Sequence, residues 1–537
     1  MSNLNWTELS VFIILFAIVT VLGFVAARWR RGDLNQLNEW GLAGRRFGTV
    51  VTWFLLGGDL YTAYTFVAVP GLVYSSGAIG FFAVPYTIIV YPFVFVVMPR
   101  LWEVCRKHHY ITPSDFVKGR YGSQGLALAV AFTGILATLP YIALQLVGIQ
   151  VVLAAMGIEG DVPLVIAFIV LAAYTYFSGL RAPALIALVK DAIIYITIIV
   201  AIIAIPIYIS NHLGHGTGIV DGYTTMFQRI PAKKLLLAPA SLTVYATLAL
   251  GSALALFMYP HSITGVLASK SGRVIKRNMA LLPAYSFLLG LIALLGFMAL
   301  VVGVTGPANP ASLSAKSYGS QVAVPALFNT AFANSQWFAG FGFAAIAIGA
   351  LVPASIMSIA SANLFTRNVL REYFMPNMTD RQESSAAKLV SLLIKLGALV
   401  FVIGLPLQNA IYFQLLGGVW ILQTAPAIVF GLYTRWFHRW ALLIGWAVGM
   451  VLGTYMAYIQ HSAPGVTPVV QHFNSSTYTL HIFGQTIGGY AAFYAVIVNI
   501  VVAAVLTVIF NAIPGTKGTD ETAATDYEEA PVAAAVA

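Results

Sequence analysis

Three ionisable residues lie inside long apolar stretches of the sequence: Asp59, Lys190 and Asp191. A charge at mid-membrane costs roughly 2.5–3.5 kcal/mol on insertion scales, so such groups usually face a cavity or a partner. Lys190 and Asp191 are neighbours that point about 100° apart on a helix, so we do not expect them to neutralise each other face to face. An amine and carboxylates in these positions can bind a proton or a cation. A structural ion pair between two helices is the alternative.

The residues around Asp59 read Gly57-Gly58-Asp59-Leu60. A glycine pair followed by an aspartate in an apolar span predicts a discontinuous helix, whose unwound backbone offers carbonyls to a cation and amides to an anion. A second candidate for such a helix surrounds Pro353, with Ser355 and Ser358 on one face at i, i+3. Packing of small residues between helices is the simpler explanation of those serines.

The elements that must position these residues are transmembrane helices. Of the 537 residues, 59% are hydrophobic and only 9% are charged, whereas a soluble domain carries roughly 25% charged residues. The apolar residues form blocks of about 20 to 30, long enough to cross a hydrocarbon core of about 30 Å as helices. Barrel strands would alternate instead of running solidly apolar. The sequence predicts an all-α polytopic membrane protein surrounded by the lipid bilayer.

About thirteen spans meet the length criterion. They cover approximately residues 9–28, 48–74, 79–101, 124–156, 162–180, 183–210, 239–266, 278–305, 337–365, 388–407, 411–433, 440–461 and 486–512. The net charge of +10 comes from short Lys and Arg clusters between the spans, so it sets topology and does not indicate nucleic-acid binding. If the N-terminus is outside, nearly all of these clusters face the cytoplasm. Only Arg229, Lys233, Lys234 and Lys316 then lie on the opposite side.

The last part of the chain differs in composition from the spans. After Pro514 it is polar and then rich in Ala and Val, which predicts a disordered cytoplasmic tail. No nucleotide-binding module is recognisable, so we do not expect ATP to drive this protein, and we expect no cofactor. These features favour a secondary carrier over an enzyme.

Four stretches in order along the chain resemble the sodium/solute symporter family. They are Gly57-Gly58-Asp59-Leu60, the run from Pro140 to Gln145, the run from Ser178 to Ala182 that precedes Asp191, and Pro260-His261. The region from Trp53 through Tyr64 and Phe82 to Arg100 looks most like the bacterial monocarboxylate uptake permeases of that family. The resemblance implies a location in the bacterial inner membrane.

The resemblance implies a leucine-transporter-type fold with two inverted repeats of five helices and a site at mid-membrane between them. The chain would then divide into a first helix and cytoplasmic loop at 1–47, a first repeat at 48–210 and a second repeat with external loops at 211–433. Two accessory helices would follow at 434–512, and the tail at 513–537.

The resemblance also implies a sodium site. It would be formed by the carbonyls of Gly57 and Leu60 and by positions Ser355, Ser358 and Ile359. Asp191 would support these groups without binding the sodium ion directly. Two departures from the family pattern alter this expectation. Ile359 supplies no oxygen where the family has Ser or Thr, and Lys190 stands where the family commonly has Thr. A built-in lysine amine beside a site that lacks one ligand predicts coupling to a proton through Lys190, with no sodium site or a weak one.

The substrate that these residues favour is a small monocarboxylate such as lactate, pyruvate, propionate or acetate. Broken-helix amides and hydroxyls can hold a carboxylate, and aromatic rings can cover a short alkyl tail. The expected substrate residues are Tyr61, Thr62, Thr65, Phe82, Tyr86, Tyr141 and Gln145. His261 is interpreted as a helix-end or gate residue.

Three other functions compete with a proton-coupled carrier. A sodium-coupled symporter of the same fold, for a monocarboxylate or another small solute, is the main alternative. A channel would show no accumulation against a gradient. A sensor would need a signalling domain, and none is recognisable in the sequence.

Overall fold

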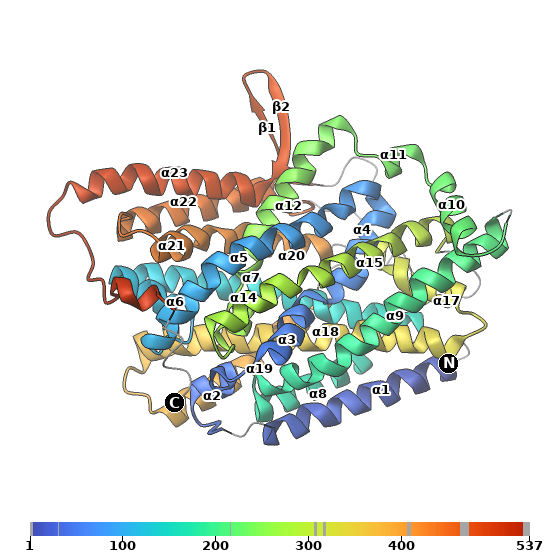
Figure 1. Cartoon of the computed structure of the whole chain (residues 1–537), viewed down its shortest axis with the longest axis horizontal. Coiled ribbons are helices and arrows are strands. Elements are labelled where there is room, and N and C mark those ends of the chain that lie inside the picture. Colours follow the sequence, from blue (N-terminus) through green and yellow to red (C-terminus); the bar gives the residue numbers. More distant parts are fainter. Residues whose placement is uncertain are drawn as a thin grey trace.

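A computed structural model describes residues 4–29, 32–214, 216–304, 309–314, 318–404, 410–461 and 472–529. The long helices run roughly along one direction, as Figure 1 shows, and a short β-hairpin projects from the bundle. Their bounds are α1 Trp6–Val25, α5 Ala83–Lys107, α7 Gln124–Ala155, α9 Arg181–Leu213, α12 Leu242–Leu256, α15 Pro283–Val302, α18 Gln336–Phe365, α19 Asp380–Gly404, α20 Ala410–Ile421, α22 Arg439–Tyr458 and α23 Ala491–Asn511. Shorter helices are α2 Leu37–Leu42, α3 Thr49–Leu60, α4 Val69–Ser76, α6 Pro113–Tyr121, α8 Val162–Ser178, α10 Ile219–Arg229, α11 Ala232–Leu235, α13 Pro260–Leu267, α14 Gly272–Leu281, α17 Ala323–Ala331 and α21 Ala425–Val429.

Eleven helical runs of the described residues are long and apolar enough to cross a membrane. Two further apolar helices, α3 and α8, are shorter, at 12 and 17 residues. The protein is therefore a multi-pass helical membrane protein. The predicted number of thirteen spans stays a prediction, because α3 and α8 do not reach the length used for the other eleven.

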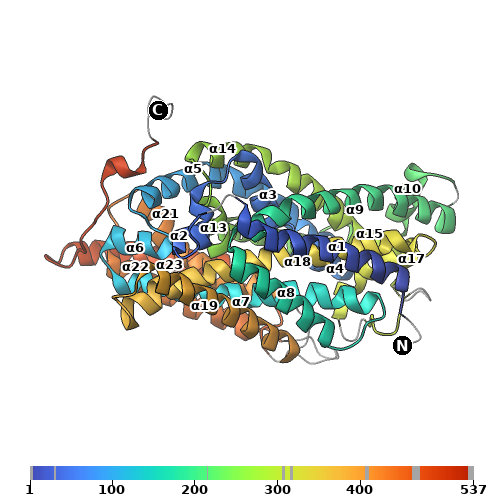
Figure 2. The same cartoon turned by 90° about the horizontal axis from the view of Figure 1, so that it is seen from below.

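Helix α18 lies at the centre of the bundle, packed against α1, α7, α9 and α19 (Figure 2). The most apolar stretch of this helix is fully buried inside the protein. The helix is rich in Gly, Ala and Ser, and such small side chains let neighbouring helices approach closely. A Cβ at Gly340 would lie 2.5 Å from the backbone of Glu8, which shows how near α1 comes. The outward faces of α1, α19 and α23 instead carry exposed Ile, Leu, Val and Phe, as expected where helices contact lipid.

Two spans are broken in the middle. Helix α3 ends at Leu60, Tyr61 has an extended backbone at φ −85° and ψ 91°, and the chain resumes helical form in a π-helical segment at Tyr64–Ala68. Helix α12 ends at Leu256 and α13 begins at Pro260. The predicted break after the glycine pair is confirmed. The second candidate is wrong: α18 continues through Pro353, because a proline-disrupted turn can be held straight by surrounding helices.

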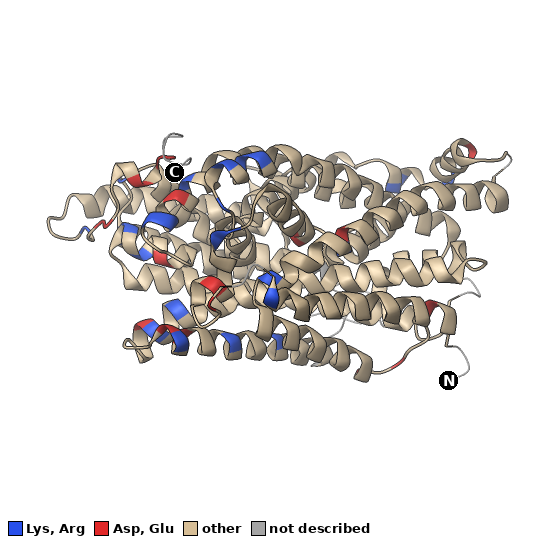
Figure 3. Cartoon of the chain, turned by 60° about the horizontal axis from the view of Figure 1, so that its bottom comes forward, with Lys and Arg blue, Asp and Glu red and all other residues tan. Residues whose placement is uncertain are grey.

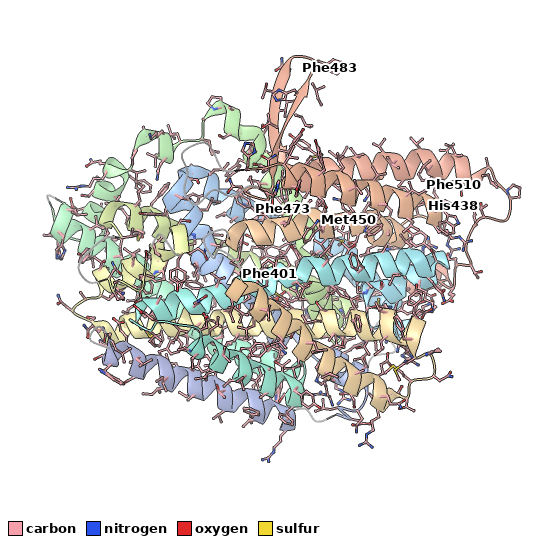
Figure 4. All side chains as sticks on the ribbon, turned by 180° about the vertical axis from the view of Figure 1, so that it is seen from behind. Phe401, His438, Met450, Phe473, Phe483 and Phe510 are labelled. Atoms are coloured by element: carbon pink, nitrogen blue, oxygen red, sulfur yellow. The ribbon has the colours of Figure 1, made fainter. Side chains whose placement is uncertain are left out.

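The predicted span 486–512 begins too early. Residues Gln485–Tyr490 form strand β2, which pairs antiparallel with β1 at Thr477–Ile482, and α23 begins only at Ala491. Gly484, at φ +74°, provides the left-handed turn between the strands. Figure 4 shows Phe483 at the tip of this hairpin, pointing away from the bundle, where its side chain is fully exposed.

The same figure shows His438 and Phe510 side by side, with their ring centroids 5.2 Å apart.

The tail is not disordered over residues 513–529, which corrects the expectation from composition. Asp520 forms ion pairs with Arg120 and Arg435, Asp526 with His108 and Lys107, and Glu529 with Lys276. Tyr527 is buried and meets Phe116 edge-on. Acidic residues are held because this end of the bundle carries most of the Lys and Arg, as Figure 3 shows. Residues 530–537 lie outside the described residues.

Candidate functional site

The broken span α3 leaves backbone carbonyls without helical partners, and Lys190 of α9 binds them. Its Nζ donates to the carbonyl of Gly58 at 2.6 Å and to the carbonyl of Tyr61 at 3.1 Å. In a continuous helix the Gly58 carbonyl would accept from the amide of Thr62, but that amide is turned to Thr65 Oγ1 at 3.5 Å. The lysine amine therefore occupies the position that unwound carbonyls offer to a cation.

Asp191 completes a buried charge pair with Lys190. Its Oδ1 lies 3.1 Å from the lysine Nζ, and both side chains have 0% exposure. Tyr285 of α15 donates a hydrogen bond to the other oxygen, Oδ2, at 2.6 Å. The expectation that these neighbours would not face each other is wrong, because the flexible four-carbon stem of lysine folds back along the helix.

The glycine pair makes this approach possible. A Cβ at Gly57 would lie 2.2 Å from Cζ of Tyr285, and a Cβ at Gly58 would lie 3.0 Å from Nζ of Lys190. A distance of 2.2 Å is too short for two carbon atoms that are not bonded, so position 57 admits no side chain while Tyr285 stays in place. The two glycines thus let Tyr285 and Lys190 pack directly on the backbone of α3, next to the break.

Asp59 joins the two breaks and is not part of the lysine pair. Its Oδ2 accepts a hydrogen bond from Ser262 Oγ at 3.2 Å and lies 3.7 Å from Nε2 of His261. Both partners belong to the first turn of α13, so the predicted position of His261 at a helix end is confirmed. Asp59 therefore links the break in α3 to the break in α12–α13.

The predicted sodium site included residues of α18, but the side chains of its two serines contact other helices. Ser355 Oγ meets Tyr174 and Thr175 of α8 at 3.2 and 3.3 Å, and Ser358 Oγ accepts from Ser391 of α19 at 3.2 Å. Ile359 is completely buried. Among the described residues, no hydrogen bond of these serine hydroxyls reaches α3 or Lys190. The structure thus gathers Gly57, Gly58, Tyr61, Lys190 and Asp191, but does not join the two serines to them by hydrogen bonds.

A second buried lysine escaped the sequence analysis. Lys395 lies within the predicted span 388–407, and its side chain is 2% exposed on α19. Its Nζ donates to Ser391 Oγ at 3.0 Å. The signal was present, since Lys395 meets the same criterion of an ionisable residue inside an apolar span that singled out Lys190.

A small cavity adjoins the lysine site. The volume open to water inside it is about 10 Å³, roughly enough for a single water molecule and far below the range of about 300–1,000 Å³ typical of pockets for drug-sized ligands. It is lined by Leu60, Tyr61, Thr65, Thr87, Tyr91, Tyr285, Ser286 and Leu289. Of the expected substrate residues, Tyr61 and Thr65 line it. Thr87, Tyr91 and Ser286 were not predicted, because their helices come close to α3 only in the folded bundle.

The remaining expected substrate residues form a neighbouring group. Gln145 Oε1 accepts a hydrogen bond from the amide of Ala63, in the break, at 2.9 Å. Tyr141 packs edge-on against Tyr259 and His261 and is hydrogen-bonded to Thr62. Phe82 and Tyr86 form a ring pair with centroids 6.2 Å apart. Polar groups and aromatic rings thus surround both sides of the break in α3.

Comparison with known proteins places this architecture in a family. The model of the sodium:solute symporter family matches residues 40–449. A monocarboxylate transport permease protein of Rhizobium johnstonii is 52% identical over 95% of this chain and 98% of its own length. An uncharacterised symporter of Bacillus subtilis is 33% identical over 86% of this chain and 90% of its own length. The chain belongs to the sodium:solute symporter family, and it is a membrane-embedded symporter.

A solved structure supports the fold independently. A sodium-coupled sialic acid symporter, in a substrate-bound outward-open state, matches with a TM-score of 0.73. The match covers 94% of this chain and 98% of that chain, at 16% sequence identity. The two proteins therefore share the fold, which is leucine-transporter-like, as the resemblance to the family implied. At this identity the likeness concerns architecture alone.

Proposed function

We propose that this symporter carries a small monocarboxylate together with a proton, and that Lys190 binds the coupling proton. The observation that carries the proposal is the position of the Lys190 amine on the carbonyls of Gly58 and Tyr61. Carbonyls exposed by a broken helix are the ligands that a transported cation uses in such folds. A lysine amine in that position supplies the positive charge from the protein itself.

The charge balance around Lys190 explains how a proton is coupled to transport. When Lys190 is protonated, it neutralises Asp191 at 3.1 Å and donates to both carbonyls. When it loses the proton, Asp191 becomes a buried charge without a counter-charge, which is costly in a low-dielectric interior. The neutral amine keeps N–H donors for the two carbonyls, but its hydrogen bonds are weaker than those of an ammonium, so α3 is held less firmly to α9. Loading and release of the proton therefore change how firmly α3 is held to α9.

A monocarboxylate substrate is supported by one relative and by the polar and aromatic groups around the break in α3. A protein 52% identical over nearly the whole chain is described as a monocarboxylate transport permease. The cavity beside Tyr61 and Thr65 has a volume of about 10 Å³ and admits only a water-sized group, so its lining groups and not its size favour a carboxylate. Its hydroxyls and the neighbouring Tyr141 and Gln145 can hold a carboxylate, while rings such as Phe82 cover an alkyl group. Substrates of the lactate, pyruvate, propionate and acetate class fit this description.

The charge distribution supports an orientation. Most Lys and Arg of the described residues lie at the end of the bundle where the tail docks (Figure 3), and positively charged loops are retained in the cytoplasm. The N-terminal end of α1 lies at the opposite end of the bundle (Figure 1). The proposed arrangement in the bacterial inner membrane therefore has the N-terminus outside and the C-terminus in the cytoplasm.

Sodium coupling is the competing function, and one observation favours it: membership of a family whose matched solved structure is sodium-coupled. Ser355 and Ser358 are present to serve such a site, although Ile359 supplies no oxygen. The two functions make opposite demands on the solution conditions, because a sodium carrier requires sodium outside and a proton carrier requires a pH gradient.

The deciding experiment is uptake of labelled monocarboxylates into proteoliposomes containing the whole chain. An inward proton gradient is imposed in sodium buffer and again with choline in place of sodium. The proposal requires accumulation in both buffers, and one proton per monoanion sustains a ratio of about tenfold per pH unit at equilibrium. Strict dependence on sodium, with no response to the proton gradient, would assign Lys190 a structural role. Accumulation of sugars or amino acids without lactate or pyruvate would refute the substrate class.

A further inference from the structure

The second buried lysine, Lys395, stands in a different environment from Lys190. Lys190 has Asp191 at ion-pair distance, whereas in the described part of the chain no Asp or Glu pairs with Lys395. The elements packed against α19 are α2, α7, α8, α18 and the π-helical segment Thr366–Phe374. Their titratable residues are Glu39, Tyr141, Tyr174, Tyr176, Arg367, Arg371, Glu372 and Tyr373, and those of α19 itself are Asp380, Arg381, Glu383 and Lys388.

Three of the four acidic residues of that set are paired elsewhere, and the fourth, Asp380, lies in the first turn of α19, roughly 20 Å along the helix from Lys395. Glu39 pairs with Arg181 and Arg46, and Glu372 pairs with Lys118. Glu383 pairs with Arg367 and Arg371 near the basic end of the bundle. An ammonium on Lys395 therefore has no counter-charge within the membrane, where a charged side chain is strongly disfavoured. A methionine would fill the same volume without that cost, so packing does not explain a lysine here.

The partners of Lys395 form a chain of hydroxyls that leads away from α19. Lys395 Nζ donates to Ser391 Oγ at 3.0 Å, and Ser391 Oγ donates to Ser358 Oγ at 3.2 Å. Ser358 Oγ donates in turn to the carbonyl of Ser355 at 2.8 Å. The lysine and all three serines are buried. Hydroxyls both donate and accept and rotate freely, so Ser391 and Ser358 can pass a proton between the amine and α18.

We propose that Lys395 is a second proton-binding group of the transport cycle, so that two protons accompany each monocarboxylate. The proposal rests on the proposed function, since it adds a proton to the one bound at Lys190. Two protons and one monoanion carry one net positive charge inward. A hydronium ion that reaches Ser358 when the carrier opens gives up its proton there and leaves as water; Ser358 passes its own proton to Ser391, Ser391 passes its own to the Lys395 amine, and the neutral amine becomes an ammonium. Release reverses these steps.

The charge carried per cycle makes the inference testable without knowing the protonation state of the lysine. Symport of one proton and one monoanion is electroneutral and does not respond to membrane potential. With two protons, an inside-negative potential drives uptake, because moving a positive charge across a potential is favourable. The accumulation ratio also rises, from about tenfold to about a hundredfold for each unit of pH gradient.

The experiment measures lactate uptake in sodium-free proteoliposomes, with a potassium diffusion potential set by valinomycin. We compare the wild type with Lys395→Met, which keeps the volume, and with Ser391→Ala, which cuts the relay and keeps the lysine. The wild type should accumulate more lactate when the interior is negative. Both variants should keep uptake driven by the proton gradient but lose the response to potential. Exchange of labelled for unlabelled lactate reports whether each variant is folded.

The outcomes separate this inference from the proposed function. Wild-type uptake that follows the proton gradient and ignores the potential overturns the second proton and leaves Lys190 in its role. A response to potential that persists in folded Lys395→Met also overturns it. If the wild type responds to neither gradient without sodium, the proposed function itself fails, and the inference fails with it. If Lys395→Met does not fold, Ser391→Ala decides in the same way.

Discussion

Lys190 on α9 donates a hydrogen bond to the backbone carbonyl of Gly58 on α3, with 2.6 Å between the two atoms. The two residues are far apart in sequence and meet because α3 ends two residues after Gly58, at Leu60. The bond ties the broken helix α3 to α9, which carries a buried charge pair. Several properties of the protein should therefore depend on this one amine.

Replacing Lys190 with alanine should abolish accumulation of lactate driven by a proton gradient. Exchange of labelled for unlabelled lactate needs no net proton movement, so it should persist if the variant folds. Lys388→Ala, which removes a partly exposed lysine near the basic end of α19, serves as the control and should behave like the wild type. Undiminished accumulation in Lys190→Ala would show that the coupling proton binds elsewhere.

The two glycines before the break should differ in their tolerance of a methyl group. In Gly57→Ala the new Cβ meets the ring of Tyr285 at 2.2 Å, so the ring that holds Asp191 must move. Overpacking of this kind typically costs about 1–3 kcal/mol. In Gly58→Ala the nearest atom, at 3.0 Å, is the flexible end of Lys190, so the loss should be smaller. Thermal unfolding in detergent, measured on both variants, tests this order, and equal stability of the two would contradict it.

Tyr141→Phe should weaken transport of short monocarboxylates without destabilising the protein. In the proposed function the phenolic hydroxyl, beside Thr62, donates to the substrate carboxylate, and a hydrogen bond to a charged group is worth about 1.5–3 kcal/mol. The KM for lactate should therefore rise by about ten- to a hundredfold. Tyr176→Phe, which removes an exposed hydroxyl from α8, is the matched control. An unchanged KM for every monocarboxylate tested would remove Tyr141 from the substrate site.

Docking of the tail through Asp526 should weaken in acid but should not change at mildly alkaline pH. Partial burial raises the pKa of Asp526, but hydrogen bonds from His108 and from the Ala523 amide outweigh it and leave that pKa below its ordinary value. A carboxyl whose pKa is lowered by docking favours docking above its free pKa of about 3.9, and this contribution is lost as the pH falls through the lowered value. Hydrogen exchange of residues 520–527 should show protection at neutral pH.

Asp526→Asn gives the matching test at constant pH. The variant keeps the size of the side chain but removes the charge that meets His108 and Lys107. Exchange in the tail should become faster, while a Glu528→Gln control should leave it unchanged, since Glu528 is exposed and forms no ion pair among the described residues. Equal protection in all three proteins would mean that Tyr527 and the backbone contacts alone hold the tail.

Several features of the site could be predicted from particular residues. The glycine pair and Asp59 in an apolar span indicated a broken helix, because such residues are tolerated there only where the backbone is unwound. Lys190 and Asp191 stood out through the cost of charge in a membrane. The same argument applies to Lys395, so this lysine too can be predicted from its position in an apolar span.

The sequence by itself determined that this is a multi-pass helical membrane protein, since hydrocarbon admits only helices from such apolar blocks. Its four ordered motifs, by resemblance, indicated the sodium:solute symporter family. Only the tertiary structure decided which groups meet. Lys190 folds back to Asp191 because its stem is flexible, while Ser355 and Ser358 bond to α8 and α19 because of how α18 is rotated. Helix rotation and side-chain rotamers depend on packing between distant segments. For the same reason the acidic tail docks on basic loops that its composition alone does not reveal.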